Sequence, residues 1–187
     1  APAKGAIIDD TDPRVVYTGN WVRRDTRFRS HNSTETWAKD AGCRAKVAFT
    51  GTGILWFSAT DILNGSARVF VDGEEQPDRI HLGARLGPGI PRGYERSSRQ
   101  MVYSVSGLPM GEHTLEIEVT GEPDRGCSSA YVPVDCFVVL GSGAEGTTRF
   151  IVTDAHNYPE LSWGDYTHPP VMVSTGTSGK VFLKLGS

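Results

Sequence analysis

Cysteine is scarce in this chain of 187 residues, which contains three. Three thiols allow one intramolecular disulfide at most. None of them stands in a C-x-x-C pair or in a Cys/His spacing that would hold zinc, so no zinc site is predicted. Cys43 and Cys136 share the parity of apolar strand neighbours, and we expect buried free thiols there; a disulfide that includes Cys127 is the alternative.

Long apolar runs and an excess of one charge are also lacking. No segment approaches the roughly eighteen apolar residues of a membrane span. Lys and Arg total 19 against 22 Asp and Glu, a net charge of -3, which predicts no general affinity for nucleic acid or for membranes. A GxSxG nucleophile elbow, a phosphate-cradling glycine loop and a metal-binding His/Cys set are absent from the sequence as well.

What the sequence does contain is alternation of apolar and polar residues. From His113 to Thr120 the apolar residues fall on odd positions, which predicts a strand with one buried face in an antiparallel sheet. Cys43 to Phe49 repeats the pattern and closes on a Gly-Thr-Gly run, so we expect a hairpin over 43–57. Arg68 to Val71 ends at Asp-Gly, the dipeptide most typical of a tight hairpin turn.

Segments without a sustained period separate these strands. Residues 18–42 and 83–99 are predicted to be long loops. With about eight strands over 6–140 and almost no helical period, the fold class is all-β, an antiparallel β-sandwich or jelly roll. Residues 141–187 are predicted to be a short β-rich C-terminal extension behind a glycine-rich hinge. The extension is too small for its own core, so it docks on the sandwich or leads to a missing domain.

Six short motifs follow one another within residues 6–140: Asp9–Pro13, Tyr17–Trp21, Phe49–Gly53, Val69–Gly73, Val105–Gly121 and Tyr131–Phe137. Their order resembles the galactose-binding-like jelly-roll modules, which are non-catalytic carbohydrate-binding domains of secreted glycoside hydrolases, lyases and esterases. The resemblance implies a secreted or cell-surface module that targets a polysaccharide for an attached catalytic domain. The extension departs from such modules, which normally end soon after the strand that corresponds to Tyr131–Leu140.

Aromatic side chains in loops are the candidates for sugar binding, because the C–H faces of sugar rings stack on aromatic rings. Trp37 is the first candidate, and Trp56, inside an apolar run, is expected in the core. The alternative for each loop aromatic is packing over the end of the sandwich. The further candidates are Trp21, Tyr94 and Trp163.

The 23–29 segment holds four arginines and one aspartate, a local positive charge on a chain that is negative overall. Guanidinium groups bind carboxylate and sulfate in bidentate geometry. Arg27 and Arg29 are therefore candidate contacts to an acidic polysaccharide such as a uronate polymer. A solvated loop is the alternative.

The resemblance also implies a structural calcium ion, since in several such modules the first and last strands supply oxygen ligands. The matching positions here are Asp10, Asp12 and Asp135. The alternative is that these aspartates, which lie close to a proline, simply cap turns.

Two other functions stay open from the sequence. One is a protein-binding or adhesion sandwich of a cell-surface protein. The other is an esterase or hydrolase fragment, for which His156 and His168 in the extension, close to Asp154 and Asp165, are the residues suited to acid–base chemistry.

Overall fold

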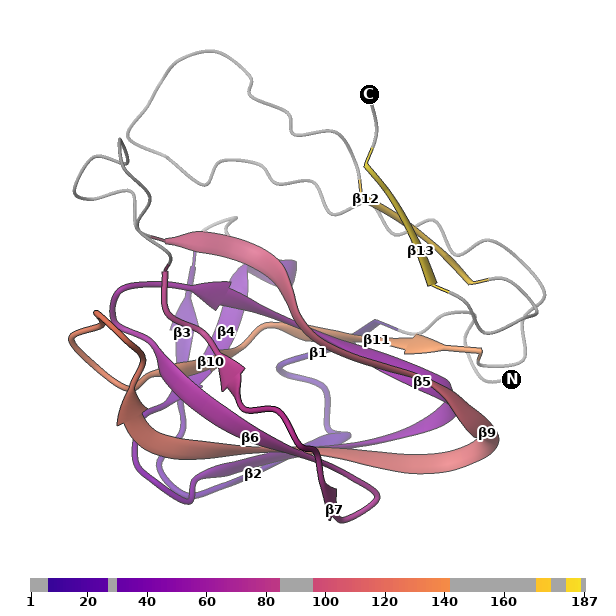
Figure 1. Ribbon diagram of the computed structural model, residues 1–187, viewed down its shortest axis with the longest axis horizontal. Helices are drawn as coiled ribbons and strands as arrows, with labels where there is room; N and C mark the ends of the chain where they lie inside the picture. Colours follow the sequence, from indigo (N-terminus) through magenta and orange to yellow (C-terminus); the bar gives the residue numbers. More distant parts are fainter. Residues whose placement is uncertain (1–6, 27–29, 85–95, 142–170, 176–180, 186–187) are drawn as a thin grey trace.

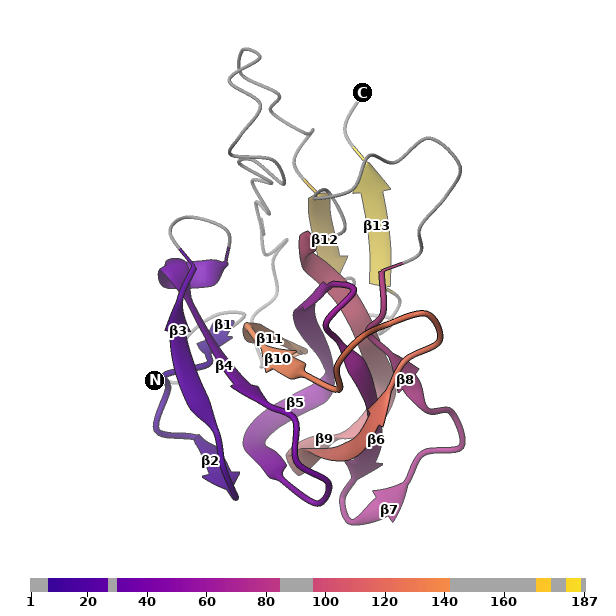
Figure 2. The ribbon, with the colours of Figure 1, turned by 90° about the vertical axis from the view of Figure 1, so that its left-hand side faces the viewer.

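The computed structural model describes residues 7–26, 30–84 and 96–141, together with the strands at 171–175 and 181–185. These residues form antiparallel sheets arranged as a sandwich (Figures 1 and 2), which confirms the predicted all-β class. A 3-10 turn over His31–Ser33 is the helical element of the described part, and no helix there is long and apolar enough to cross a membrane.

The large sheet of the sandwich has eight strands, and its main order is β1-β11-β5-β9-β6-β7. β2 pairs with β5, and β8 pairs with β6. The strands are β1 (Ile7–Asp9), β2 (Val15–Thr18), β5 (Arg44–Thr60), β6 (Gly65–Val71), β7 (Glu74–Glu75), β8 (Ile80–His81), β9 (Ser97–Pro123) and β11 (Cys136–Leu140).

The small sheet has three strands in the order β10-β4-β3, and Figure 2 shows β3 and β4 as a separate layer beside the large sheet. Its strands are β3 (Val22–Asp25), β4 (Thr34–Ala38) and β10 (Val132–Val134). The prediction of one long loop over 18–42 is therefore wrong. Two strands form there because they pair with each other, although every residue of β3 is exposed and leaves no apolar period in the sequence.

β5 and β9 lie side by side as two long, curved strands (Figure 1), paired from Arg44 opposite Glu118 to Thr60 opposite Ser97. The predicted hairpin over 43–57 is wrong, because β5 continues through its two glycines with only a shift of register. A Cβ atom at Gly51 would collide with the carbonyl oxygen of Leu140, and one at Gly53 with that of Val105. The glycines permit close approach of neighbouring backbones instead of a turn.

The main core lies between the two sheets, and the predicted alternation fills it. Leu115, Ile117 and Val119 of β9 are fully buried, as is Trp56 of β5, which confirms both predictions. The Asp72-Gly73 turn is also confirmed, since both residues have positive φ, of 51° and 85°. The three cysteines are free thiols, two of them buried.

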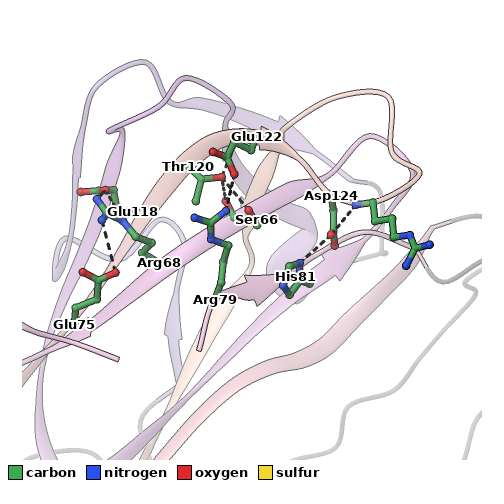
Figure 3. A network of polar contacts seen from close by, with 10 residues as sticks. Ser66, Arg68, Glu75, Arg79, His81, Glu118, Thr120, Glu122 and Asp124 are labelled. Atoms are coloured by element: carbon green, nitrogen blue, oxygen red, sulfur yellow. Dashed lines mark hydrogen bonds and ion pairs between the residues drawn. The ribbon is translucent and has the colours of Figure 1, made fainter. Parts of the chain in front are cut away.

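The outward face of the β6–β9 region carries charged residues in opposite-sign pairs (Figure 3). Arg68 pairs with Glu118 and Glu75, and Arg79 with Glu122 at 2.5 Å. Because each of these cations already has a carboxylate partner, this face carries little unpaired charge for a ligand.

The extension contributes a two-stranded antiparallel hairpin of β12 (Val171–Thr175) and β13 (Val181–Leu185). This agrees with the predicted β-rich character of the extension. The boundary between module and extension stays a prediction.

Candidate functional site

Trp37 lies near the end of β4, the central strand of the small sheet, opposite Val22 of β3 and Pro133 of β10. Successive residues of a strand point to opposite faces. Ala38 belongs to the main core, so Trp37 belongs to the outer face of the small sheet, where its side chain is half-buried. The small sheet therefore displays this indole on its outer face.

Glu35, two residues earlier on the same face, is fully buried and fixes the orientation of that indole. Its Oε2 accepts a hydrogen bond of 2.8 Å from Trp37 Nε1 and one of 2.6 Å from Arg96. Its Oε1 accepts a bond of 2.6 Å from the Ser30 hydroxyl. A buried carboxylate is stable only when it is paired and hydrogen-bonded, and this one has both kinds of partner.

The surroundings of the Trp37 ring are aromatic and cationic. Tyr131 meets it edge-on at 5.8 Å between ring centroids. The guanidinium carbons of Arg96 and Arg24 lie 5.1 Å and 5.9 Å from the indole centroid, and Lys39 Nζ lies 5.6 Å from the Tyr131 ring. We call these residues, with Glu35, the Trp37 site.

The cations of the Trp37 site differ in how they are balanced. Arg96 is neutralised by Glu35 and by Asp61, whose Oδ2 lies 3.5 Å away. Arg24 and Lys39 are exposed, and no carboxylate of the described residues pairs with either. The site thus combines two neighbouring rings with two positive charges that no carboxylate of the described ranges balances. Such a surface can stack a sugar ring and hold an anionic substituent beside it.

Trp21 has a different environment from Trp37. Its ring lies 5.0 Å from that of Tyr17, its Nε1 donates to the Thr18 carbonyl at 3.1 Å, and it packs against the main core. These contacts are those of an aromatic packed over the sandwich. Six other predicted site residues lie outside the described residues: Arg27, Arg29, Tyr94, Trp163 and, for the hydrolase alternative, the pair His156 and His168.

The three aspartates predicted as calcium ligands have separate partners. Both oxygens of Asp10 accept threonine hydroxyls at 2.6 Å, from Thr34 and Thr36, and burial raises its pKa. Asp12 binds the side chain of Arg14 at 2.6 Å, which lowers its pKa. No three His, Cys, Asp or Glu residues within the described ranges are grouped as a metal site. These residues do not fit a calcium ion held by all three aspartates.

Asp135 is the most perturbed carboxyl group of this region. Its Oδ1 accepts the His31 backbone N–H at 2.8 Å, whereas its buried Oδ2 has no hydrogen-bond partner. Burial, reinforced by the nearby charge of Glu35, raises its pKa to about 8. Asp135 is therefore protonated in the folded protein at neutral pH.

The sequence pattern indicated Trp37 but not its supporting residues Glu35, Tyr131, Lys39 and Arg96. A signal for Glu35 does exist, because Thr34 to Ala38 is rich in strand-forming threonine and tryptophan. A strand there would have placed Glu35 and Trp37 on the same face. Arg96 and Tyr131 are distant from Trp37 in sequence. Tyr131 directly precedes β10, which pairs with β4, and Arg96 directly precedes β9 of the large sheet.

Comparisons with known proteins point to carbohydrate-active enzymes. A search against models of known protein families finds no match. The chain is 28% identical over 134 residues to an A type blood N-acetyl-alpha-D-galactosamine deacetylase of Flavonifractor plautii, and 28% identical over 117 residues to an A type blood alpha-D-galactosamine galactosaminidase of the same organism. These alignments cover 72% and 62% of this chain but 15% and 10% of those enzymes, so the chain corresponds to a small part of each.

Solved structures show the same architecture. A Paenibacillus xanthan lyase matches with a TM-score of 0.53 and 9% identity, over 74% of this chain and 14% of that chain. A Paenibacillus sp. cycloisomaltooligosaccharide glucanotransferase, complexed with cycloisomaltoheptaose, matches with a TM-score of 0.50 and 15% identity, over 73% of this chain and 18% of that chain. At these identities the likeness concerns the fold, a β-sandwich that also occurs within carbohydrate-active enzymes.

Proposed function

We propose that this chain is a non-catalytic carbohydrate-binding module of the galactose-binding-like kind, which holds an attached enzyme on its polysaccharide. The observation that carries the proposal is the Trp37 site: an indole on the outer face of the small sheet, held in orientation by buried Glu35 and joined by Tyr131. A preorganised aromatic surface loses little conformational entropy when it stacks a ring.

Similarity to parts of larger enzymes supports the attached partner. The two curated relatives act, by their names, on galactosamine-containing blood-group structures, and the matched segment is a small fraction of each. An appended module raises the local concentration of its enzyme on the substrate surface without chemistry of its own. Such a role belongs outside the cell, where polysaccharides are found, so the localisation that we propose is secreted or cell-surface.

The finer proposal is an acidic ligand, and it rests on the two cations for which the described part of the chain supplies no carboxylate partner. Arg24 and Lys39 stand beside the rings of Trp37 and Tyr131, respectively. A neutral sugar would leave both charges facing water, whereas a uronate or a sulfated sugar would pair with them. The charge of the Trp37 site therefore favours a polyanionic glycan.

Affinity electrophoresis of the chain through gels that contain neutral or acidic polysaccharides tests the function. The proposal predicts retarded migration in at least one acidic gel and weaker or no retardation in neutral gels. Normal migration in every gel would contradict it. A protein-binding or adhesion role would then be the better account, and hydrolysis assays with His156 and His168 substituted would test the remaining alternative.

A further inference from the structure

The large sheet is apolar on both of its faces at one place, where β5 and β11 pair. Ile54 and Trp56 of β5, with Phe137 and Val139 of β11, point into the main core. The residues between them form a second cluster on the opposite face, which we call the second apolar face: Leu55, Phe57, Cys136, Val138 and Leu140. Antiparallel sheets of a two-layer sandwich normally face water on that side.

The second apolar face is nevertheless buried. Its five side chains are at most 3% exposed, although Ile7 is the partly buried apolar residue of the described part that packs against them. Neighbouring strands of the same sheet cannot cover a face on which they themselves lie. A third layer is required above β5 and β11.

The β12–β13 hairpin presents a matching surface. In its register Val171 stands opposite Leu185 and Val173 opposite Leu183, so these four apolar residues share one face. The other face holds Ser174 and Lys184 together with Met172 and Phe182, so the first face is the more apolar of the two. An isolated two-stranded hairpin is at best marginally stable in water, and it needs a surface on which to bury its apolar side.

We infer that the apolar side of the β12–β13 hairpin packs on the second apolar face and forms a third layer of this domain. Leu140, the last residue of β11, belongs to the second apolar face, so the chain leaves the sandwich beside the surface that needs cover. Residues 141–170 then allow a reach of up to about 100 Å, which is more than the docking requires. Because both surfaces belong to one chain, their effective concentration is high.

Cys136 serves as a built-in reporter of this docking, because it lies on the second apolar face, whereas Cys43 lies in the main core. The full-length chain is treated with a small maleimide, and labelling of each cysteine is followed by peptide mass spectrometry. Two variants are compared: Val173→Asp with Leu183→Asp on the apolar side of the hairpin, and Ser174→Asp with Lys184→Asp on its other side.

The inference predicts that the first variant raises the labelling rate of Cys136 by about tenfold or more and leaves that of Cys43 slow, because local opening exposes one thiol and not the other. The matched control should leave both rates near those of the unsubstituted chain. Equal Cys136 rates in the two variants would overturn the inference, as would Cys136 protection that depends on protein concentration, which would assign the cover to a second copy.

If the first variant unfolds altogether, both thiols will react quickly and the comparison is lost. A milder pair of single substitutions then tests the docking. Leu183→Ala removes apolar contact without adding a charge, and Lys184→Ala is its control. Faster labelling of Cys136 alone in Leu183→Ala supports the docked hairpin. Unchanged labelling of Cys136 in that variant contradicts it.

Discussion

Trp37 donates its indole hydrogen bond, 2.8 Å long, to a carboxylate that is itself fully buried, that of Glu35. The same carboxylate binds Arg96 and the Ser30 hydroxyl. The orientation of the candidate ligand-binding ring and the stability of the fold therefore depend on one polar group. Removal of that group is expected to affect both.

Glu35→Ala should lower the free energy of unfolding by about 3–5 kcal/mol, because it leaves Arg96 buried with an incomplete set of partners. Urea denaturation followed by tryptophan fluorescence measures the change. Glu122→Ala is the matched control, since the Glu122–Arg79 pair is exposed at the surface; it should cost less than about 1 kcal/mol. Similar costs in the two variants would mean that the Glu35 network does not stabilise the site.

The sequence predicted the parts of this fold in which burial follows a period of two. Leu115, Ile117 and Val119 alternate with polar residues in one half-buried strand, and the Asp72-Gly73 turn depends on local backbone preference. Both features are local, so the sequence displays them.

What the sequence did not predict depends on contacts between distant segments. β3 is exposed along its length and forms because it pairs with β4, so it carries no hydrophobic signal. Glu35 looks like a surface residue in the sequence, and its burial depends on Arg96, 61 positions away. Glycines 51 and 53 resemble turn residues, but they permit the approach of backbones from β11 and β9.

Asp135 should make the folded protein less stable as the pH rises from 5 to 8. Its folded pKa of about 8 exceeds the reference value of 3.8, so between these values the folded state keeps a proton that the unfolded chain has lost. Asp135→Asn removes this pH-dependent contribution of the Asp135 proton. The free energy of unfolding of the variant, relative to that of the unsubstituted chain, should therefore increase by up to about 3 kcal/mol between pH 5 and pH 8.

Urea denaturation at several pH values measures that increase. Asp12→Asn is the control, because the folded pKa of Asp12 is lowered, and its contribution is lost only as the pH falls below the reference value of 3.8. The stability difference for this control should stay constant from pH 5 to pH 8. An Asp135→Asn difference that is equally constant would show that Asp135 is ionised in the folded protein.

Calcium stays a prediction from the resemblance, and the observed carboxylate partners argue against it. Asp10 is occupied by two hydroxyls and Asp12 by Arg14, which leaves Asp135 Oδ2 as the open oxygen among the three. We expect the melting temperature to be the same in excess chelator and in millimolar calcium. A melting temperature that rises with calcium, and no longer rises in Asp135→Asn, would establish the ion.

An acidic ligand should bind more weakly as salt increases, because the charges of Arg24 and Lys39 are exposed and screened by ions. Once a retained polysaccharide is identified, titration between about 0.02 and 0.5 M salt should show a steep loss of affinity. Arg24→Ala and Lys39→Ala should each weaken binding by about two- to fivefold at low salt. Arg79→Ala, which removes an ion-paired cation directly before β8, should have no effect. Affinity that is independent of salt would exclude charge recognition.

Binding by Trp37→Ala, compared with Phe70→Ala, tests the central claim most directly. Phe70 is a suitable control, because it is also half-buried and flanked by two guanidinium groups, those of Arg44 and Arg68, but it lies on the large sheet. Isothermal titration with the retained polysaccharide, on variants whose melting shows that they are folded, should give about tenfold or greater loss of affinity for Trp37→Ala, because the stacking surface is gone. Phe70→Ala should bind as the unsubstituted chain does. Unchanged affinity in Trp37→Ala would contradict the account and place any carbohydrate site elsewhere on the sandwich.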